Sequence, residues 1–179
     1  ADSWQITQYG DEGGYQYMFY TIVDNTGRLV IVDGGFEGNA DVVRNVIKQH
    51  NNHVTAWIIT HPHPDHLCND GSMMFKVSGR KKSMLFCADV QSEMEPYILA
   101  SYRNQLHADY VQIGHHGNWG LTTDFYGVVN PSAVFFDGPR SLIDDESGKY
   151  DGYLLRNYFA AKGIPEYRFT TAPNTVVVE

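Results

Sequence analysis

The apolar positions of the chain fall into short runs bounded by turn residues, and most of these runs predict β-strands. They lie at residues 4–8, 15–23, 29–32, 56–60, 72–77, 83–88, 109–113, 132–136, 166–170 and 174–178. The run at 56–60 is continuously apolar up to Thr60, which predicts a buried strand. Residues 78–80 (Ser-Gly-Arg) are typical of a turn and predict a hairpin between two of the strands.

Other segments have the spacing of amphipathic helices. Helices are predicted at residues 39–50, 92–102 and 151–162. Asn39 and Asp151 are candidate N-caps, and Ser92 with Glu95 forms a capping box for the middle helix. The predicted apolar faces are Val42, Val43, Val46 and Ile47 on the first helix, and Leu154, Leu155, Tyr158 and Phe159 on the third. Strands in runs with helices between them predict two sheets covered by helices, in a single domain over residues 1–179.

The composition predicts a folded protein with a small-molecule substrate. Hydrophobic residues make up 42% of the chain and charged residues 19%, which is ordinary for a globular domain. The net charge is −8, and the only basic cluster, residues 80–82, lies at the predicted hairpin tip, so a nucleic-acid substrate is disfavoured without being ruled out. No apolar run is long enough to span a bilayer, and no protein partner is predicted.

The expected location is outside a bacterial cell or in its envelope, with the cytoplasm as the alternative. Residues 1–3 (Ala-Asp-Ser) suit the start of a processed chain, and abundant Tyr with two Cys suits an exported protein. The predicted hairpin leaves Cys68 about 15 Å out of register with Cys87, too far for a disulfide. We therefore expect two free thiols, with Cys87 in the core.

Three histidines and one aspartate, all candidate metal ligands, lie within residues 61–66 (HPHPDH), directly after the run at 56–60. Neutral imidazole and carboxylate are ligands for borderline divalent metals. The two prolines keep the chain extended, so His61 and His63 point the same way and can hold one ion. Asp65 and His66 follow the second proline, where the chain can turn toward a second ion. The alternative is a His-rich surface loop, which random composition seldom produces at a strand end.

Further candidate ligands also follow apolar strands. Asp89 ends one strand, and the pair His115-His116 follows another. Each has a plainer interpretation: a carboxylate at a helix N-terminus, or a turn with one satisfied imidazole. Asp33, followed by two glycines, is by itself best explained as a turn. Together with the loop at 61–66, Asp89 and the His pair favour a metal site at one edge of the sheets.

The chain resembles the metallo-β-lactamase-fold hydrolases over nearly its whole length. The matching pieces are residues 32–35 (VDGG), 60–66 (THPHPDH), 88–89 (AD) and 108–118 (ADYVQIGHHGN). The last piece is most similar to the subgroup with the metallo-hydrolase domain of bacterial DNA-uptake channels and the exported phosphorylcholine esterases. The HxHxDH element is highly specific, and the His-His-Gly element narrows the subgroup moderately.

The resemblance implies an α+β fold, a four-layer αββα sandwich, with two metal ions at one edge of the sheets. The implied ligands are His61 and His63 for the first ion, Asp65 and His66 for the second, Asp89 as the bridge, and His115. It implies that His116 is a supporting or substrate-contacting group, and the roles of His115 and His116 are interchangeable at this stage. Asp33 would contact and orient the histidine loop without binding a metal ion itself.

Two departures from the family pattern stand out. Relatives have a much longer stretch after the histidine loop, where only residues 67–71 remain here, and in the lactamases that stretch supplies another His ligand. Either the fold is truncated after this loop or the printed sequence leaves residues out. A Gly-His-Pro that subgroup members often carry near the last helix is replaced by residues 148–152 (GKYDG), where Lys149 or Tyr150 is a candidate substitute.

The implied activity is hydrolysis by a bridging water that two cations activate, with zinc as the first choice and manganese or iron as alternatives. We expect a phosphodiester-type substrate, with Asp65 or His116 passing a proton to the leaving group. Trp119 is a candidate wall for a cationic group such as choline, although a packed core position is the stronger expectation. The alternatives are a lactone, thioester or β-lactam hydrolase, and a non-catalytic metal-binding module.

Overall fold

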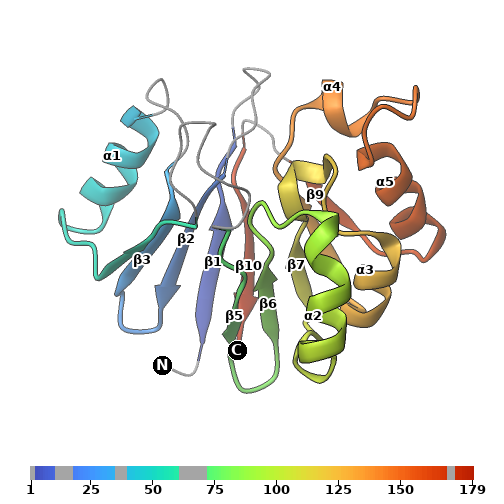
Figure 1. Ribbon diagram of the computed structural model, residues 1–179. Helices are drawn as coiled ribbons and strands as arrows, with labels where there is room; N and C mark the ends of the chain where they lie inside the picture. The colour runs from blue at the N-terminus through green and yellow to red at the C-terminus, as the bar shows by residue number, and fades with distance from the viewer. Residues whose placement is uncertain (1–2, 11–17, 35–39, 61–71, 169–171) are drawn as a thin grey trace.

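The computed structural model describes residues 3–10, 18–34, 40–60, 72–168 and 172–179 (Figure 1). Its strands are β1 (Trp4–Gln8), β2 (Phe19–Asp24), β3 (Leu29–Asp33), β4 (Ala56–Ile58), β5 (Phe75–Ser78), β6 (Ser83–Phe86), β7 (Tyr110–Gln112), β8 (Ala133–Phe136), β9 (Glu166–Arg168) and β10 (Asn174–Val178). Its α-helices are α1 (Ala40–Gln49), α2 (Glu95–Tyr102), α3 (Thr123–Val129), α4 (Arg140–Ile143) and α5 (Gly152–Ala161). Short 3₁₀ turns, η3 (Ser92–Met94), η4 (Arg103–Gln105) and η5 (Gly114–Gly117), connect some of them.

The described strands form two five-stranded sheets, ordered β10-β1-β2-β3-β4 and β5-β6-β7-β8-β9. In the first sheet only β3 and β4 are parallel, whereas in the second the strands from β6 to β9 all run parallel. Parallel strands end at the same edge of a sheet, so the residues that follow β6, β7 and β8 lie side by side. The two sheets meet near this edge, because the Gln8 side-chain amide at the end of β1 donates to the Phe136 carbonyl at the end of β8 (3.2 Å).

Three buried apolar clusters hold the elements together. The cluster between the sheets includes Tyr20 and Val32 from the first sheet and Phe86 and Phe135 from the second. A smaller cluster joins the outer face of β2 and β3 to α1, and the largest joins the second sheet to α2, α3 and α5. Figure 1 shows α1 on one side of the two sheets and the other labelled helices on the opposite side. Among the described residues, none of the helices is long and apolar enough to cross a membrane.

Most predicted strands and helices are present with bounds shifted by a few residues. The hairpin turn at 78–80 is confirmed, with Ser78 opposite Ser83. Cys87 is a free, fully buried thiol as predicted, and Cys68 lies outside the described residues. The short helices α3 and α4 were not predicted, because seven and four residues are too few to show a clear period.

The prediction of a buried strand at 56–60 was wrong. Trp57 is 47% exposed and Ile59 is 54% exposed. β4 is an edge strand that pairs with β3 alone among the described strands, so its apolar side chains lack a covering neighbour on one side. Hydrophobicity indicates burial on average, and it does not reveal whether a strand lies at the centre or the edge of a sheet.

The predicted capping box and parts of both helix faces were also wrong. Glu95 is buried and does not cap its own helix; its carboxylate accepts from the backbone N–H (2.6 Å) and hydroxyl (2.7 Å) of Thr122. Asp151 occupies the N-cap position of α5 without a side-chain capping bond, and Asn39 lies outside the described residues. Val42 and Leu154 are exposed, since only one narrow stripe of each helix faces its sheet.

Candidate metal centre

Asp89 and His116 come together at the edge where β6 and β7 end. The His116 Nε2 lies 3.4 Å from a carboxylate oxygen of Asp89, and its Nδ1 lies 3.2 Å from a carboxylate oxygen of Asp137. The His116 side chain is 7% exposed, Asp89 is 14% exposed, and Asp137 is fully buried. One imidazole is therefore held between two carboxylates, with Asp89 on the more open side.

Asp137 is the functional candidate that sequence reasoning missed. It follows the apolar strand β8 directly, which is the same signal that singled out Asp89 after β6. Gln112 at the end of β7 donates to Asp137 (3.1 Å), and its carbonyl oxygen accepts from the backbone N–H groups of Cys87 and Ala88. This buried amide therefore ties the strand end before Asp89 to the carboxylate that holds His116.

The backbone at this edge is strained. Ala88, His115 and His116 have φ values of 47°, 49° and 57°, in the left-handed region that non-glycine residues rarely adopt. The His115 backbone N–H donates to the Ala88 carbonyl (2.8 Å), which joins the two strained turns. A Cβ on Gly138 would lie 2.6 Å from the His116 carbonyl oxygen, so a glycine is needed where the chain after β8 passes His116. Strain that the surrounding structure maintains is common at functional sites.

The electrostatics favour positive charge between the two carboxylates. Burial alone lowers the pKa of His116, but the charges and hydrogen bonds of Asp137 and Asp89 outweigh it and raise that pKa to about 10. Burial raises the pKa of Asp137 despite the neighbouring imidazole. Burial likewise raises the pKa of the Cys87 thiol, with a contribution from Asp137, so this cysteine is not a nucleophile at neutral pH.

Asp33 contacts the residue that precedes the predicted histidine loop. One carboxylate oxygen accepts from the Thr60 backbone N–H (2.8 Å) and the other from the Thr60 hydroxyl (2.6 Å). The φ of Asp33 is 53°, so its carboxylate leaves the end of β3 from a strained position. His61, His63, Asp65 and His66 themselves lie outside the described residues.

The described residues do not form a metal site by themselves. They contain no group of three or more His, Cys, Asp or Glu side chains placed to hold an ion. Asp89 and His116 do fit a divalent cation, because they offer a carboxylate and an imidazole at a position that already favours positive charge. Of the other predicted ligands, His115 lies within the described residues, and the remaining four belong to the loop at 61–66.

His115 and Trp119 lie close to this centre in sequence. His115 is half-buried, and its ring centre is 6.4 Å from that of His116. Trp119 is 58% exposed, so the expectation that it packs in the core was wrong. Its φ is 52°, in the left-handed region. The predicted substrate contact of Trp119 stays a prediction.

Residues 16–74 match the model of the metallo-beta-lactamase superfamily. The match covers a minority of the chain and includes Asp33, Thr60 and the whole histidine loop. It supports a metal-dependent hydrolase, and the mixed α and β architecture with two sheets is consistent with that fold. A search of curated proteins found no match to the chain.

Proposed function

We propose that this protein is a metal-dependent hydrolase of phosphodiester-type substrates, with its site at the common edge of the two sheets. The observation that supports it most is the buried His116 between Asp89 and Asp137, at the edge where β6, β7 and β8 end. Residues 1–179 would form one αββα domain of the phosphorylcholine esterase-like subgroup. The three apolar clusters, one between the sheets and one under each helical layer, support that order of layers.

The geometry favours His116 over His115 as the ligand from this strand end. The His116 Nε2 is directed at Asp89, while Asp137 fixes its other nitrogen, as carboxylates behind metal-bound histidines do. We therefore assign the substrate-contacting role to His115. His61, His63, Asp65 and His66 would complete two ion sites bridged by Asp89, with zinc as the first choice.

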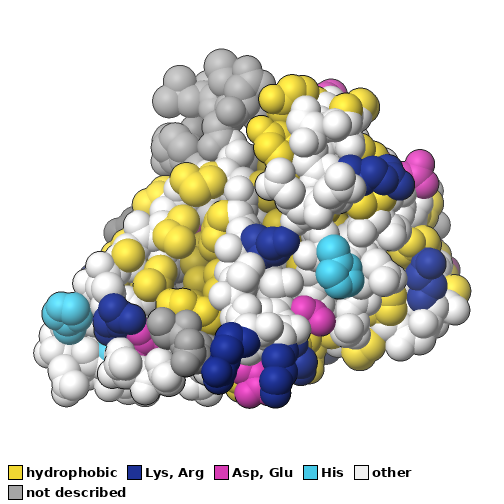
Figure 2. Space-filling view, turned by 90° about the horizontal axis from the view of Figure 1, so that it is seen from below, with side chains coloured by type: hydrophobic (Ala, Val, Ile, Leu, Met, Phe, Trp, Pro, Cys, Tyr) yellow, Lys and Arg dark blue, Asp and Glu magenta, His cyan; other side chains and the backbone are white. Residues whose placement is uncertain are grey.

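The bound ions would lower the pKa of a shared water toward about 7 and so make hydroxide available at neutral pH. The protein residues would position this chemistry. Asp137 holds the Nδ1 proton of His116, which keeps Nε2 directed toward Asp89. Asp65 or His115 would pass a proton to the leaving group. The substrate would be a small molecule, because the basic side chains on the face in Figure 2 are spread over it in small groups, and Lys81 at the hairpin tip forms an ion pair with Glu179.

We also propose that the short connection after the histidine loop, residues 67–71, is the natural one. The Met73 backbone N–H donates to the Thr60 carbonyl (3.0 Å), so the residues on either side of 61–72 are already joined. A loop closed in this way needs no longer insertion to connect β4 with β5. We propose that the open edge of β4 is a consequence of the missing segment.

The proposed function is tested by metal content and hydrolysis. Protein purified without chelators is expected to contain about two zinc, manganese or iron ions per chain and to hydrolyse bis-(p-nitrophenyl) phosphate. Chelation should remove both the ions and the activity, and zinc should restore both. Turnover of nitrocefin or a lactone instead would move the substrate to the alternative class. A metal-free, inactive protein would contradict the proposal.

Asp33→Ala is expected to lower hydrolysis about 10- to 100-fold while the protein stays folded. The substitution removes both hydrogen bonds to Thr60 and so releases the start of the histidine loop. Steady-state kcat/KM and metal content measure the effect. The matched control is Asp41→Ala, which removes an exposed carboxylate from α1 and should change neither quantity. Unchanged activity in Asp33→Ala would show that the Asp33–Thr60 contact does not support the site.

A further inference from the structure

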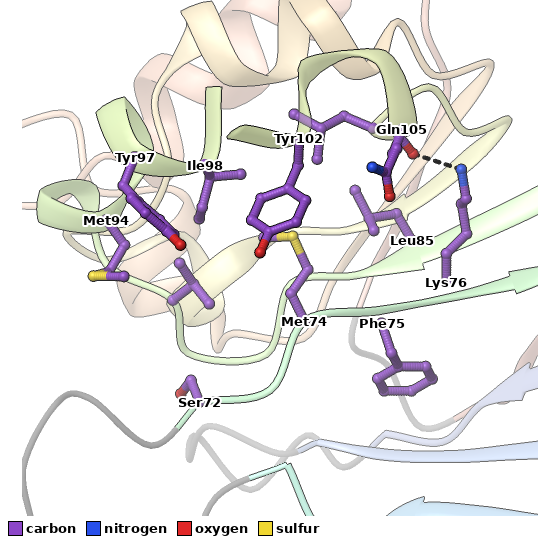
Figure 3. A pocket seen from close by; sticks show the side chains of 12 residues that line it. Ser72, Met74, Phe75, Lys76, Leu85, Met94, Tyr97, Ile98, Tyr102 and Gln105 are labelled. Atoms are coloured by element: carbon purple, nitrogen blue, oxygen red, sulfur yellow. Dashed lines mark hydrogen bonds between the residues drawn. The ribbon is translucent and has the colours of Figure 1, made fainter. Parts of the chain in front are cut away.

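A cavity of about 820 Å³ lies between α2 and the strands β5 and β6 (Figure 3). Its floor and walls are apolar and come from Met74, Phe75, Leu85, Val90, Ile98 and Leu106. The volume and the apolar lining are those of a small-molecule site. None of the residues assigned to the metal centre lines it, although Val90 follows Asp89 directly in the chain.

The outer wall of the cavity is exposed and aromatic. Met94, Tyr97 and Tyr102 on this wall are 42%, 58% and 44% exposed. The two tyrosine rings meet at an angle of 70° with their centres 6.2 Å apart, and the hydrogen bond between their hydroxyls raises the pKa of Tyr102. A ligand in the cavity would cover apolar surface that is otherwise in contact with water, which favours binding.

One end of the cavity carries a positive charge. Lys76 Nζ donates to the backbone carbonyls of Gln105 (2.6 Å) and His107 (3.2 Å), as Figure 3 shows for Gln105. Both partners are neutral, and no acidic side chain among the described residues forms an ion pair with Lys76. An ammonium group has three donors, so one remains for an anionic ligand.

We propose that this cavity binds a small amphipathic carboxylate, with its hydrocarbon chain on the apolar floor and its carboxylate at Lys76. The apolar lining favours the hydrocarbon chain of the ligand. The Lys76 ammonium, which forms no ion pair within the described part of the chain, favours a single anionic head group. The proposal does not depend on the metal-dependent activity.

Binding of octanoate and of 1-octanol to the whole chain, measured by isothermal titration calorimetry, tests the head group. Octanoate is expected to bind more tightly than 1-octanol. Lys76→Gln should weaken octanoate binding about tenfold and leave 1-octanol unchanged, because only the charge-assisted hydrogen bond is lost. Lys48→Gln, on α1, is the matched control and should alter neither. Equal affinities for the two ligands, or equal weakening by Lys76→Gln, would overturn the assignment of the head group.

A second pair of variants tests the position of the chain. Met74→Trp fills the cavity and should abolish binding of both ligands, while Met73→Trp, at the neighbouring exposed position outside the lining, should leave binding intact. Unfolding curves establish that both variants are folded. Octanoate binding that survives Met74→Trp in folded protein would overturn the proposal. A dimer in sedimentation that octanoate does not dissociate and Met74→Trp abolishes would assign the cavity to a second copy instead, which also overturns it.

Discussion

His116→Ala is expected to reduce hydrolysis of bis-(p-nitrophenyl) phosphate far more than about 100-fold, the upper range for the loss of a supporting residue. It removes the imidazole that points at Asp89 and leaves the buried Asp137 carboxylate without its cationic partner. Metal content per chain should fall together with kcat/KM. His115→Ala is expected to keep its metal and to lose activity more moderately, because its ring is half-buried to one side of the Asp89–Asp137 pair.

The comparison of the two histidines decides which of them holds the metal. His53→Ala, an exposed imidazole after α1, is the control for the loss of a surface histidine and should behave as the unmodified protein. Thermal unfolding of each variant separates a loss of activity from a loss of fold. If His115→Ala loses its metal while His116→Ala keeps both metal and activity, the assignment of His116 as the ligand is wrong. His115 is then the ligand, as the family resemblance implies.

Phe86→Ala is expected to lower the free energy of unfolding by about 3–5 kcal/mol, a large part of the stability of a domain of this size. Phe86 is fully buried in the cluster between the sheets. Its ring stacks on Phe75 with centres 4.7 Å apart and meets the edge of Tyr20 at 5.2 Å. Alanine would leave a cavity between two sheets whose backbones cannot close around it.

Denaturant unfolding measures this effect as a lower midpoint with an unchanged slope. Leu154→Ala is the matched control: it removes a large apolar side chain that is 58% exposed on α5, and it should change stability by less than about 0.5 kcal/mol. Equal effects from the two variants would show that the space between the sheets is not the main core. A changed slope for Phe86→Ala would show that the variant has a less compact folded state or no longer unfolds in one two-state transition.

Several site residues were predictable because they come within a few residues of the end of an apolar strand. Asp89 after β6 and the His pair after β7 were identified in this way, and parallel pairing of β6 with β7 brings their ends together. The same signal was present for Asp137 after β8 and was overlooked, since an acidic residue before glycine is equally typical of a turn. Which histidine faces Asp89 was not predictable, because two adjacent residues in left-handed turns do not follow the alternation of a strand.

The sequence by itself determined the order of most strands along the chain, the buried Cys87, and the positions of Asp89 and the His pair after their strands, because these depend on local spacing and hydrophobicity. Only the tertiary structure decided that β4 is an exposed edge, that Glu95 binds Thr122, that Asp137 holds His116, and that a cavity with Lys76 at one end lies beside α2. Each of these depends on contacts between segments far apart in the chain, and no local pattern encodes such contacts.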